Sequence, residues 1–212
     1  MIVYPGITEK SLKNVLARVA LYRSSVDGFH FDFADGIFVP NVLLSIDDLG
    51  DLPNYFFEAH LMVEKPEEYF ERCMVRGFKR VIVHTEALKE QSDEYILKTQ
   101  EQVNAMGMEF GLSFKKGSTI PYNILCKLNY ALVMTIVPGF SGQPFLSEQV
   151  DMVKDIRANC ADLIIGVDGH VDMETAPILR DAGVNALIST SFLSGDDLTD
   201  KYLKLKGIDN VN

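Results

Sequence analysis

Long apolar runs are missing from this sequence of 212 residues. No stretch approaches the roughly 20 consecutive apolar residues that a membrane-spanning helix needs. The first residues, MIVYPGITEK, also lack the basic segment followed by an apolar stretch that is typical of a secretion signal. We therefore expect a cytoplasmic protein without a membrane partner.

Positive charge is also in short supply. Lysine and arginine number 20 against 30 aspartates and glutamates, which gives a formal net charge of -10. A field of that sign repels nucleic acids and anionic lipid surfaces, so we expect neither as a partner. An anionic small molecule would have to be held by local groups.

Cysteine is scarce as well. Cys73, Cys126 and Cys160 are odd in number, widely separated and not part of any CxxC pair. We therefore expect neither disulfides nor thiolate metal sites, and we interpret the three as small core residues.

Short β-rich runs alternate with helix-like segments along the chain. Eight such runs in 212 residues correspond to about 26 residues each, close to the lower size limit of a (β/α)8 barrel. No low-complexity segment or Gly/Ser linker divides the series, which predicts one domain over residues 1–212. The β-rich runs cover residues 2–4, 28–33, 56–63, 80–84, 109–114, 132–135, 163–168 and 186–189. Helical patterns include 15–22, 150–156 and 175–182, and the final segment, 198–212, fits a last helix with a polar tail.

The fold class predicted is therefore α/β, as a single (β/α)8 TIM barrel. An open doubly wound sheet would alternate in the same way. However, no GxGxxG motif opens the first helix, which weakens that alternative.

Polar side chains interrupt the apolar runs near their carboxyl ends. In a parallel barrel these ends meet at one mouth, where the side chains that do chemistry are found. Parallel strands are otherwise almost continuously apolar, so these exceptions indicate a site. The residues are His30 and Asp32 in HFDFADGIFVPN, His60 in AHLMV, His84 and Glu86 in VHTEA, and Asp168 in GVDG.

Each of these residues also has a purely structural interpretation. His60 alone could be a hydrogen-bonded core residue, and Asp35 or Asp168 could cap a helix. Several uncompensated charges around one mouth would, however, cost several kcal/mol each. A divalent cation removes the difficulty, because two imidazoles and two carboxylates form a donor set suited to Zn, Mn, Fe or Co.

Five motifs, taken together and in order, resemble the signatures of the ribulose-phosphate 3-epimerase family. They are HFDFADGIFVPN, AHLMVEKPEEY, VHTEA, VMTIVPGFSGQPF and VDGHVDMET. The resemblance runs from about residue 4 to residue 193 and is specific, because the five motifs recur with compatible spacing. It implies a barrel of the ribulose-phosphate-binding type and, as in many members, a homo-oligomer.

The resemblance also implies roles for particular residues. Asp32 and Asp168 match the acid/base pair that moves the proton at C3, while His30, Asp32, His60 and Asp168 match the ligands of one divalent cation. Two such groups on opposite faces of the carbon are what inversion through an enediolate requires. A cation touching both carboxylates would also stabilise the enediolate's charge.

A phosphate site is expected at the loop after the sixth strand and at the helix N-termini after the seventh and eighth strands. The glycine-containing loop GFSGQPF follows the sixth strand, and such loops let backbone N–H groups approach phosphate oxygens, although it could be only a flexible turn. Met62 and Met134 match methionines that face the substrate in the family, with ordinary core packing as the alternative. The phosphate-binding candidates are Gly139, Ser141, Gly142, Gly169, His170, Thr190 and Ser191.

The sequence departs from the family pattern at several positions. Gly6 stands where the family usually has Ser, and Ala34 where it has Met, and we expect both changes to widen the mouth. His170 and Thr190-Ser191 stand where it has Gly and Gly-Ser, which puts side chains into the phosphate cradle. His170 could donate a hydrogen bond there and, when protonated, supply a charge.

The function predicted is that of an isomerase, a metal-dependent 3-epimerase of a small-molecule ketose phosphate. D-ribulose 5-phosphate, converted to D-xylulose 5-phosphate, is the first choice of substrate. The alternatives are a 3-epimerase of another ketose phosphate such as allulose 6-phosphate, or a non-catalytic barrel that binds a sugar phosphate. A metal-free lyase or aldose isomerase would not need the His/Asp set, and nothing indicates nicotinamide, flavin or pyridoxal chemistry.

Overall fold

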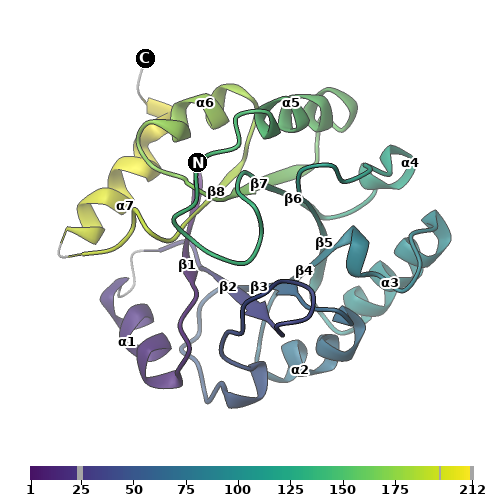
Figure 1. The fold of residues 1–212 in the computed structure, drawn as a ribbon, viewed down its shortest axis with the longest axis horizontal. Coiled ribbons are helices and arrows are strands. Elements are labelled where there is room, and N and C mark those ends of the chain that lie inside the picture. Colours follow the sequence, from purple (N-terminus) through teal and green to yellow (C-terminus); the bar gives the residue numbers. More distant parts are fainter. Residues whose placement is uncertain (23–25, 196, 211–212) are drawn as a thin grey trace.

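Eight parallel strands close into a barrel in this computed structural model, which describes residues 1–22, 26–195 and 197–210. The strands follow one another around the barrel in chain order, and the first pairs with the eighth. Helices surround the strands on the outside (Figure 1). The predicted (β/α)8 TIM barrel is thus confirmed.

The strands and helices occur in strict alternation, apart from a 3-10 turn in place of the helix after β2. The strands are β1 (Ile2–Ile7), β2 (Phe29–Ala34), β3 (Phe57–Met62), β4 (Arg80–His84), β5 (Glu109–Phe114), β6 (Tyr130–Met134), β7 (Ile164–Asp168) and β8 (Ala186–Ser189). The helices are α1 (Leu12–Tyr22), α2 (Phe70–Val75), α3 (Asp93–Ala105), α4 (Tyr122–Leu125), α5 (Gln149–Asn159), α6 (Thr175–Asp181) and α7 (Leu198–Lys206).

The last helix begins at Leu198, where the sequence predicts a final helix with a polar tail. It ends at Lys206, and a 3-10 turn, Gly207–Asn210, follows it. Glycine is a poor helix former, which accounts for the change at this point. Residues 211–212 of the predicted segment lie outside the described residues.

The alternation of β2 explains the motif HFDFADGIFVPN. Successive side chains of a strand point to opposite faces. Phe29, Phe31 and Phe33 are buried in the large cluster between barrel and helices, together with residues of α1 such as Val15. His30 and Asp32 therefore point into the barrel.

A smaller cluster fills the barrel itself. Tyr4 of β1, Ile82 of β4, Leu132 of β6 and Ile188 of β8 pack together there. Several of these strands are not neighbours in the barrel, so their side chains meet only across its interior. The barrel is a packed core below the mouth, as in other folds of this type.

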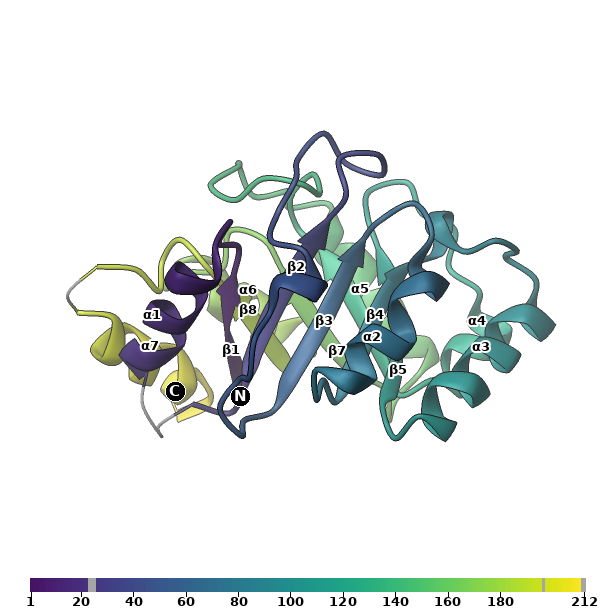
Figure 2. The same ribbon diagram turned by 90° about the horizontal axis from the view of Figure 1, so that it is seen from below.

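Two long loops rise above the carboxyl ends of the strands (Figure 2). One follows β2 and the other follows β6. Asp35 fixes the turn that leaves β2, because its carboxylate accepts hydrogen bonds from the backbone N–H of Ile37 at 2.8 Å and of Glu64 at 2.7 Å. Asn41 joins the two loops by donating its side-chain amide to the Gly139 carbonyl at 2.6 Å.

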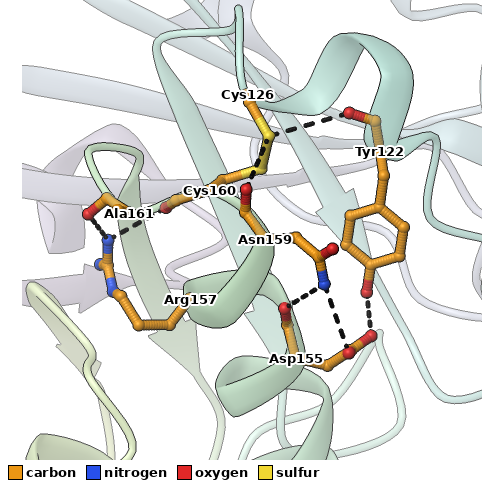
Figure 3. Close-up of a disulfide and its surroundings, with 7 residues drawn as sticks. All are labelled: Tyr122, Cys126, Asp155, Arg157, Asn159, Cys160 and Ala161. Atoms are coloured by element: carbon orange, nitrogen blue, oxygen red, sulfur yellow. Dashed lines mark hydrogen bonds between the residues drawn. A yellow bond between two sulfur atoms is a disulfide. The ribbon is translucent and has the colours of Figure 1, made fainter.

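A disulfide joins Cys126 to Cys160, so the expectation that no disulfide forms is wrong (Figure 3). Both cysteines lie just after a helix and before the next strand, at the end of the barrel opposite the mouth. Their separation of 34 residues is about one strand-helix unit. Adjacent strand-helix units place equivalent positions side by side in the folded chain, although these positions are far apart in the sequence.

The third cysteine, Cys73, is a free buried residue, as expected. Within the described ranges, no helix has the length and apolar character needed to cross a membrane.

Candidate active site

Four polar side chains converge at the mouth of the barrel. His30 and Asp32 lie two residues apart on β2, and the strand register places Asp32 beside His60 of β3. One donor atom from each of these three residues and one from Asp168 all lie within 4.8 Å of one another. The structure thus brings together the four side chains for which a shared cation was expected.

The donor atoms fit a divalent cation. Asp32 Oδ1 lies 2.8 Å from His60 Nδ1 and 3.3 Å from His30 Nε2. His30 Nε2 is buried and has no hydrogen-bond partner within the described part of the chain. A buried polar atom left in this way is costly unless something binds it. Two imidazoles and two carboxylates form a mixed nitrogen and oxygen set that accepts Zn, Mn, Fe or Co.

A buried carboxylate fixes the orientation of the His30 ring. His30 Nδ1 donates to Glu58 Oε1 at 2.6 Å, which directs Nε2 toward the mouth. Arg80 Nη1 in turn donates to the other Glu58 oxygen at 2.6 Å, and both partners are buried. Such a carboxylate behind a histidine ligand fixes its tautomer and raises its basicity.

Sequence reasoning missed Glu58 and Arg80 because both stand inside β-rich runs. The signal lies in the register, which pairs His30 with Glu58 and Glu58 with Arg80 across three neighbouring strands. That two residues of different strands are neighbours can be recognised only once the register is known.

His60 is supported by a second imidazole. Its Nε2 lies 2.9 Å from Nε2 of His84, a buried residue at the end of β4. One nitrogen of this pair must carry the proton. Because His60 Nδ1 donates to the Asp32 carboxylate, Nε2 of the neutral His60 ring accepts the hydrogen bond from His84 Nε2. The strand-end position of His84 was evident from the sequence, but its part in orienting His60 was not.

The two aspartates have opposite proton affinities. For Asp32, burial favours protonation, but the adjacent His30 and His60 imidazoles outweigh it and hold the pKa well below its usual range. For Asp168, burial reinforced by the charge of Asp32 raises the pKa to about 7. Without a cation, the mouth therefore holds one ionised carboxylate and one carboxyl that binds a proton near neutral pH.

The imidazoles differ in the same way. Burial opposes a charge on His30, but the adjacent carboxylates of Asp32 and Glu58 outweigh it and raise its pKa. Burial lowers the pKa of His60. Burial also lowers the pKa of His84 strongly, and the neighbouring His60 and Lys115 act in the same direction. A cation arriving at His30 Nε2 would have to displace a proton, so its binding is coupled to pH.

A cavity of about 200 Å³ opens over the two aspartates. Met62 and Met134, predicted to contact the substrate, both lie on its wall and are otherwise buried. Thr8, Lys10 and Asn41 also line it. These three were not anticipated, because they stand on loops whose approach to the mouth depends on the folded chain.

A narrower recess adjoins this cavity at the ends of β7 and β8. Asp168 borders both spaces, so the recess begins next to the proton-transfer groups. All seven predicted phosphate-binding residues lie in one space or the other. Gly139 lines the main cavity, Gly142, Gly169, His170 and Ser191 line the recess, and Ser141 and Thr190 line both.

His170 ties the loop after β6 to the end of β7. Its Nδ1 donates to the Gln143 carbonyl at 2.7 Å, and its Nε2 lies 3.6 Å from the Asp172 carboxylate. Its φ of 51° is in the left-handed region that glycine occupies at lower cost. The His170 side chain thus lines the recess and also contacts the loop after β6.

The expected widening of the mouth at Gly6 and Ala34 is wrong. A Cβ atom at Gly6 would meet Thr190 Oγ1 at 1.9 Å, so the Thr190 hydroxyl fills the space that Gly6 leaves. Ala34 is buried and packs with Val39, Leu43 and Met62. In both places a neighbouring side chain compensates for the smaller residue.

Comparisons with known proteins agree with this architecture. The sequence model of the ribulose-phosphate 3 epimerase family matches residues 5–193. A ribulose-phosphate 3-epimerase of Chlamydia pneumoniae is 32% identical over 204 residues, covering 88% of this chain and 86% of the relative. The chloroplastic ribulose-5-phosphate-3-epimerase of Arabidopsis thaliana is 31% identical over 206 residues, covering 92% and 72%.

Among solved structures, 3-keto-L-gulonate-6-phosphate decarboxylase from Vibrio cholerae has a similar fold. Its TM-score is 0.73 at 13% sequence identity, over 99% of this chain and 97% of that one. At this identity the likeness concerns the barrel alone.

Proposed function

Because the chain belongs to the ribulose-phosphate 3-epimerase family, we propose that it interconverts D-ribulose 5-phosphate and D-xylulose 5-phosphate by inverting C3. The observation that carries this proposal is the pair of aspartates. Asp32 and Asp168 stand on β2 and β7, border one cavity and differ in proton affinity.

The reaction removes the proton from C3 on one face and returns a proton on the other. An ionised carboxylate accepts the first proton, and a protonated carboxyl donates the second. Asp32 and Asp168 would serve as these two groups, and the reverse reaction exchanges their roles. The carbanion formed between the two steps is delocalised onto the neighbouring ketone as an enediolate.

His30, Asp32, His60 and Asp168 would hold a divalent cation, which we propose to be Zn, Fe, Mn or Co. When bound, such a cation supplies positive charge close to the ketone, where negative charge develops. Glu58 and His84 hold the two imidazoles in place for it.

The recess beside Asp168 would take the phosphate. Backbone N–H groups near Gly142 and Gly169 and the hydroxyls of Ser141 and Ser191 offer donors there. This arrangement accounts for an anionic substrate in a chain with a net charge of -10. We propose that the phosphate anchors one end of the sugar while C3 lies between the aspartates.

The size of the mouth gives no support to a larger sugar. The space next to Gly6 is filled by Thr190, and Ala34 is buried beneath Val39 and Leu43. We therefore rank D-ribulose 5-phosphate above allulose 6-phosphate, and comparing kcat/KM for the two sugars checks this order.

The test is epimerisation by the metal-loaded protein, followed together with exchange of the C3 proton in deuterated water. We expect Asp32→Asn and Asp168→Asn each to lower kcat by at least about 100-fold, since each removes one proton-transfer group. Glu148→Gln, on the protein surface, serves as the control and should retain full activity. A wild-type protein that binds the sugar but exchanges no proton would mean a non-catalytic barrel.

A further inference from the structure

Gly6 and Thr190 share one volume at the join between β1 and β8. The register pairs Pro5 with Ser189, so the next residues, Gly6 and Thr190, face each other. A Cβ atom at Gly6 would lie 1.9 Å from Thr190 Oγ1 and 3.1 Å from Thr190 Cβ. Only one of the two positions can carry a side chain in this conformation.

The backbone does not explain the glycine. Gly6 is not among the residues with positive φ, so its conformation is open to other amino acids. Its buried position against Thr190 is therefore the physical reason for the missing side chain. The side chain that fills this space, the Thr190 hydroxyl, thus comes from the residue after β8 and not from β1.

Thr190 is held in place through its backbone. Arg18 of α1 donates to the Thr190 carbonyl at 3.1 Å and also to the Leu193 carbonyl, and Tyr22 donates to the latter at 2.9 Å. The Thr190 hydroxyl makes no hydrogen bond to the residues that the structure describes. A fixed hydroxyl with free hydrogen-bonding capacity on a cavity wall is suited to a ligand.

The position of the Thr190 hydroxyl defines which part of a bound substrate it would contact. Thr190 lines both the main cavity, which contains the two aspartates, and the recess at the ends of β7 and β8. With C3 between the aspartates and the phosphate in the recess, the carbon that passes Thr190 is C4 of the pentulose.

We propose that Thr190 is a specificity-determining residue whose hydroxyl hydrogen-bonds the C4 hydroxyl of the bound ketose phosphate. This inference rests on the proposed function for the orientation of the sugar. It identifies the substrate class further, as a ketose phosphate with a free hydroxyl next to the reacting carbon on the phosphate side.

The test compares two variants on two substrates. Thr190→Val keeps the shape and removes the hydroxyl, whereas Thr190→Ser keeps the hydroxyl. With D-ribulose 5-phosphate we expect kcat/KM to fall about 10-fold for the Val variant and less than about 3-fold for the Ser variant. With the 4-deoxy analogue of this substrate, wild type and Thr190→Val should be equal within about 2-fold. An equal loss on both substrates, or no loss on either, would overturn the proposal.

A second measurement checks the steric relation independently of activity. Gly6→Ala should lower Tm in the wild-type background, and the double variant Gly6→Ala/Thr190→Gly should recover the Tm of Thr190→Gly alone. Additive effects of the two changes would show that the two positions do not compete for one volume.

Calorimetric titration of the metal-loaded protein with the two sugars separates this proposal from the proposed function. A wild type that binds D-ribulose 5-phosphate without epimerising it would refute the function. Thr190 would still be supported if Thr190→Val weakened binding of that sugar about 10-fold and left binding of the deoxy analogue unchanged. Unchanged affinity for both sugars would refute the role of Thr190 itself.

Discussion

Arg80 illustrates how one residue can serve a site that it does not touch. Its guanidinium lies between two carboxylates of very different exposure, buried Glu58 and half-exposed Glu109. The Glu58 contact supports the His30 ring, while the Glu109 contact only adds a surface partner. The two acidic residues therefore form a matched pair for experiment.

At this scale we predict a large effect for Glu58→Gln. The change leaves the buried Arg80 charge without its buried partner, which should cost about 3–5 kcal/mol of unfolding free energy. It should also weaken cation binding about 10–100-fold, because the carboxylate behind His30 is lost. Denaturant unfolding of the metal-free protein and a metal titration measure the two effects.

Glu109→Gln is the control for that variant. The Glu109 carboxylate is 46% exposed, so its loss should cost less than about 1 kcal/mol and leave cation affinity unchanged. Equal effects of the two substitutions would contradict the part assigned to Glu58.

Single residues also differ in how far the sequence alone could identify them. His30, Asp32 and Asp168 were predictable because a charged or imidazole side chain inside an apolar run violates the pattern of a parallel strand. Glu58 and Arg80 also violate the apolar pattern of a parallel strand. Their role behind His30, however, can be recognised only when their contact with each other and the strand register are known. Thr190 was noticed as an unusual residue, yet its relation to Gly6 required the coordinates.

At the scale of elements, seven of the eight strands were located to within two residues, because apolar β-rich runs bounded by polar residues define them well. The first strand, β1, continues three residues beyond the predicted run. The turn Gly207–Asn210 was not anticipated, since it belongs to a polar tail without a periodic pattern. The Cys126–Cys160 link was missed because it joins neighbouring strand-helix units.

For these elements we predict that the disulfide contributes stability but no activity. Reduction, or Cys126→Ser combined with Cys160→Ser, should lower the unfolding free energy by about 2–4 kcal/mol, which is about 4–16 °C in Tm. The kcat/KM value should stay the same, because both cysteines lie just before a strand, at the end of the barrel opposite the aspartates.

A thermal scan with and without a reducing agent measures this effect, and the double serine variant is the control that should not respond. Identical scans of the wild type under both conditions would show that the two thiols are not joined.

At the scale of the whole molecule, the charged mouth connects fold stability with pH. The folded-state pKa of Asp168 is about 7, above the value of about 3.9 for an unfolded chain. A raised pKa contributes stability that is fully present below pH 4 and is lost as the pH rises through 7. We therefore expect the metal-free wild type to lose stability between pH 5 and pH 8 relative to Asp168→Asn, by up to about 3 kcal/mol, since most of the loss within this range occurs below pH 7.

Denaturant unfolding with a chelator at pH 5 and pH 8 measures this difference. Adding a divalent cation at pH 8 should then restore the wild type but not the Asn variant, because only the former keeps all four donors. A difference between the two proteins that does not change with pH would contradict the raised pKa of Asp168.

Closure of the barrel has a consequence beyond the site. An open sheet exposes a row of unpaired backbone groups along its outermost strands, where strands of other molecules can add and aggregation begins. Here the first and last strands pair with each other, so the ring has no such border. Residues at the mouth can therefore change during evolution, and a bound ion can be lost, without exposing a template for fibril growth.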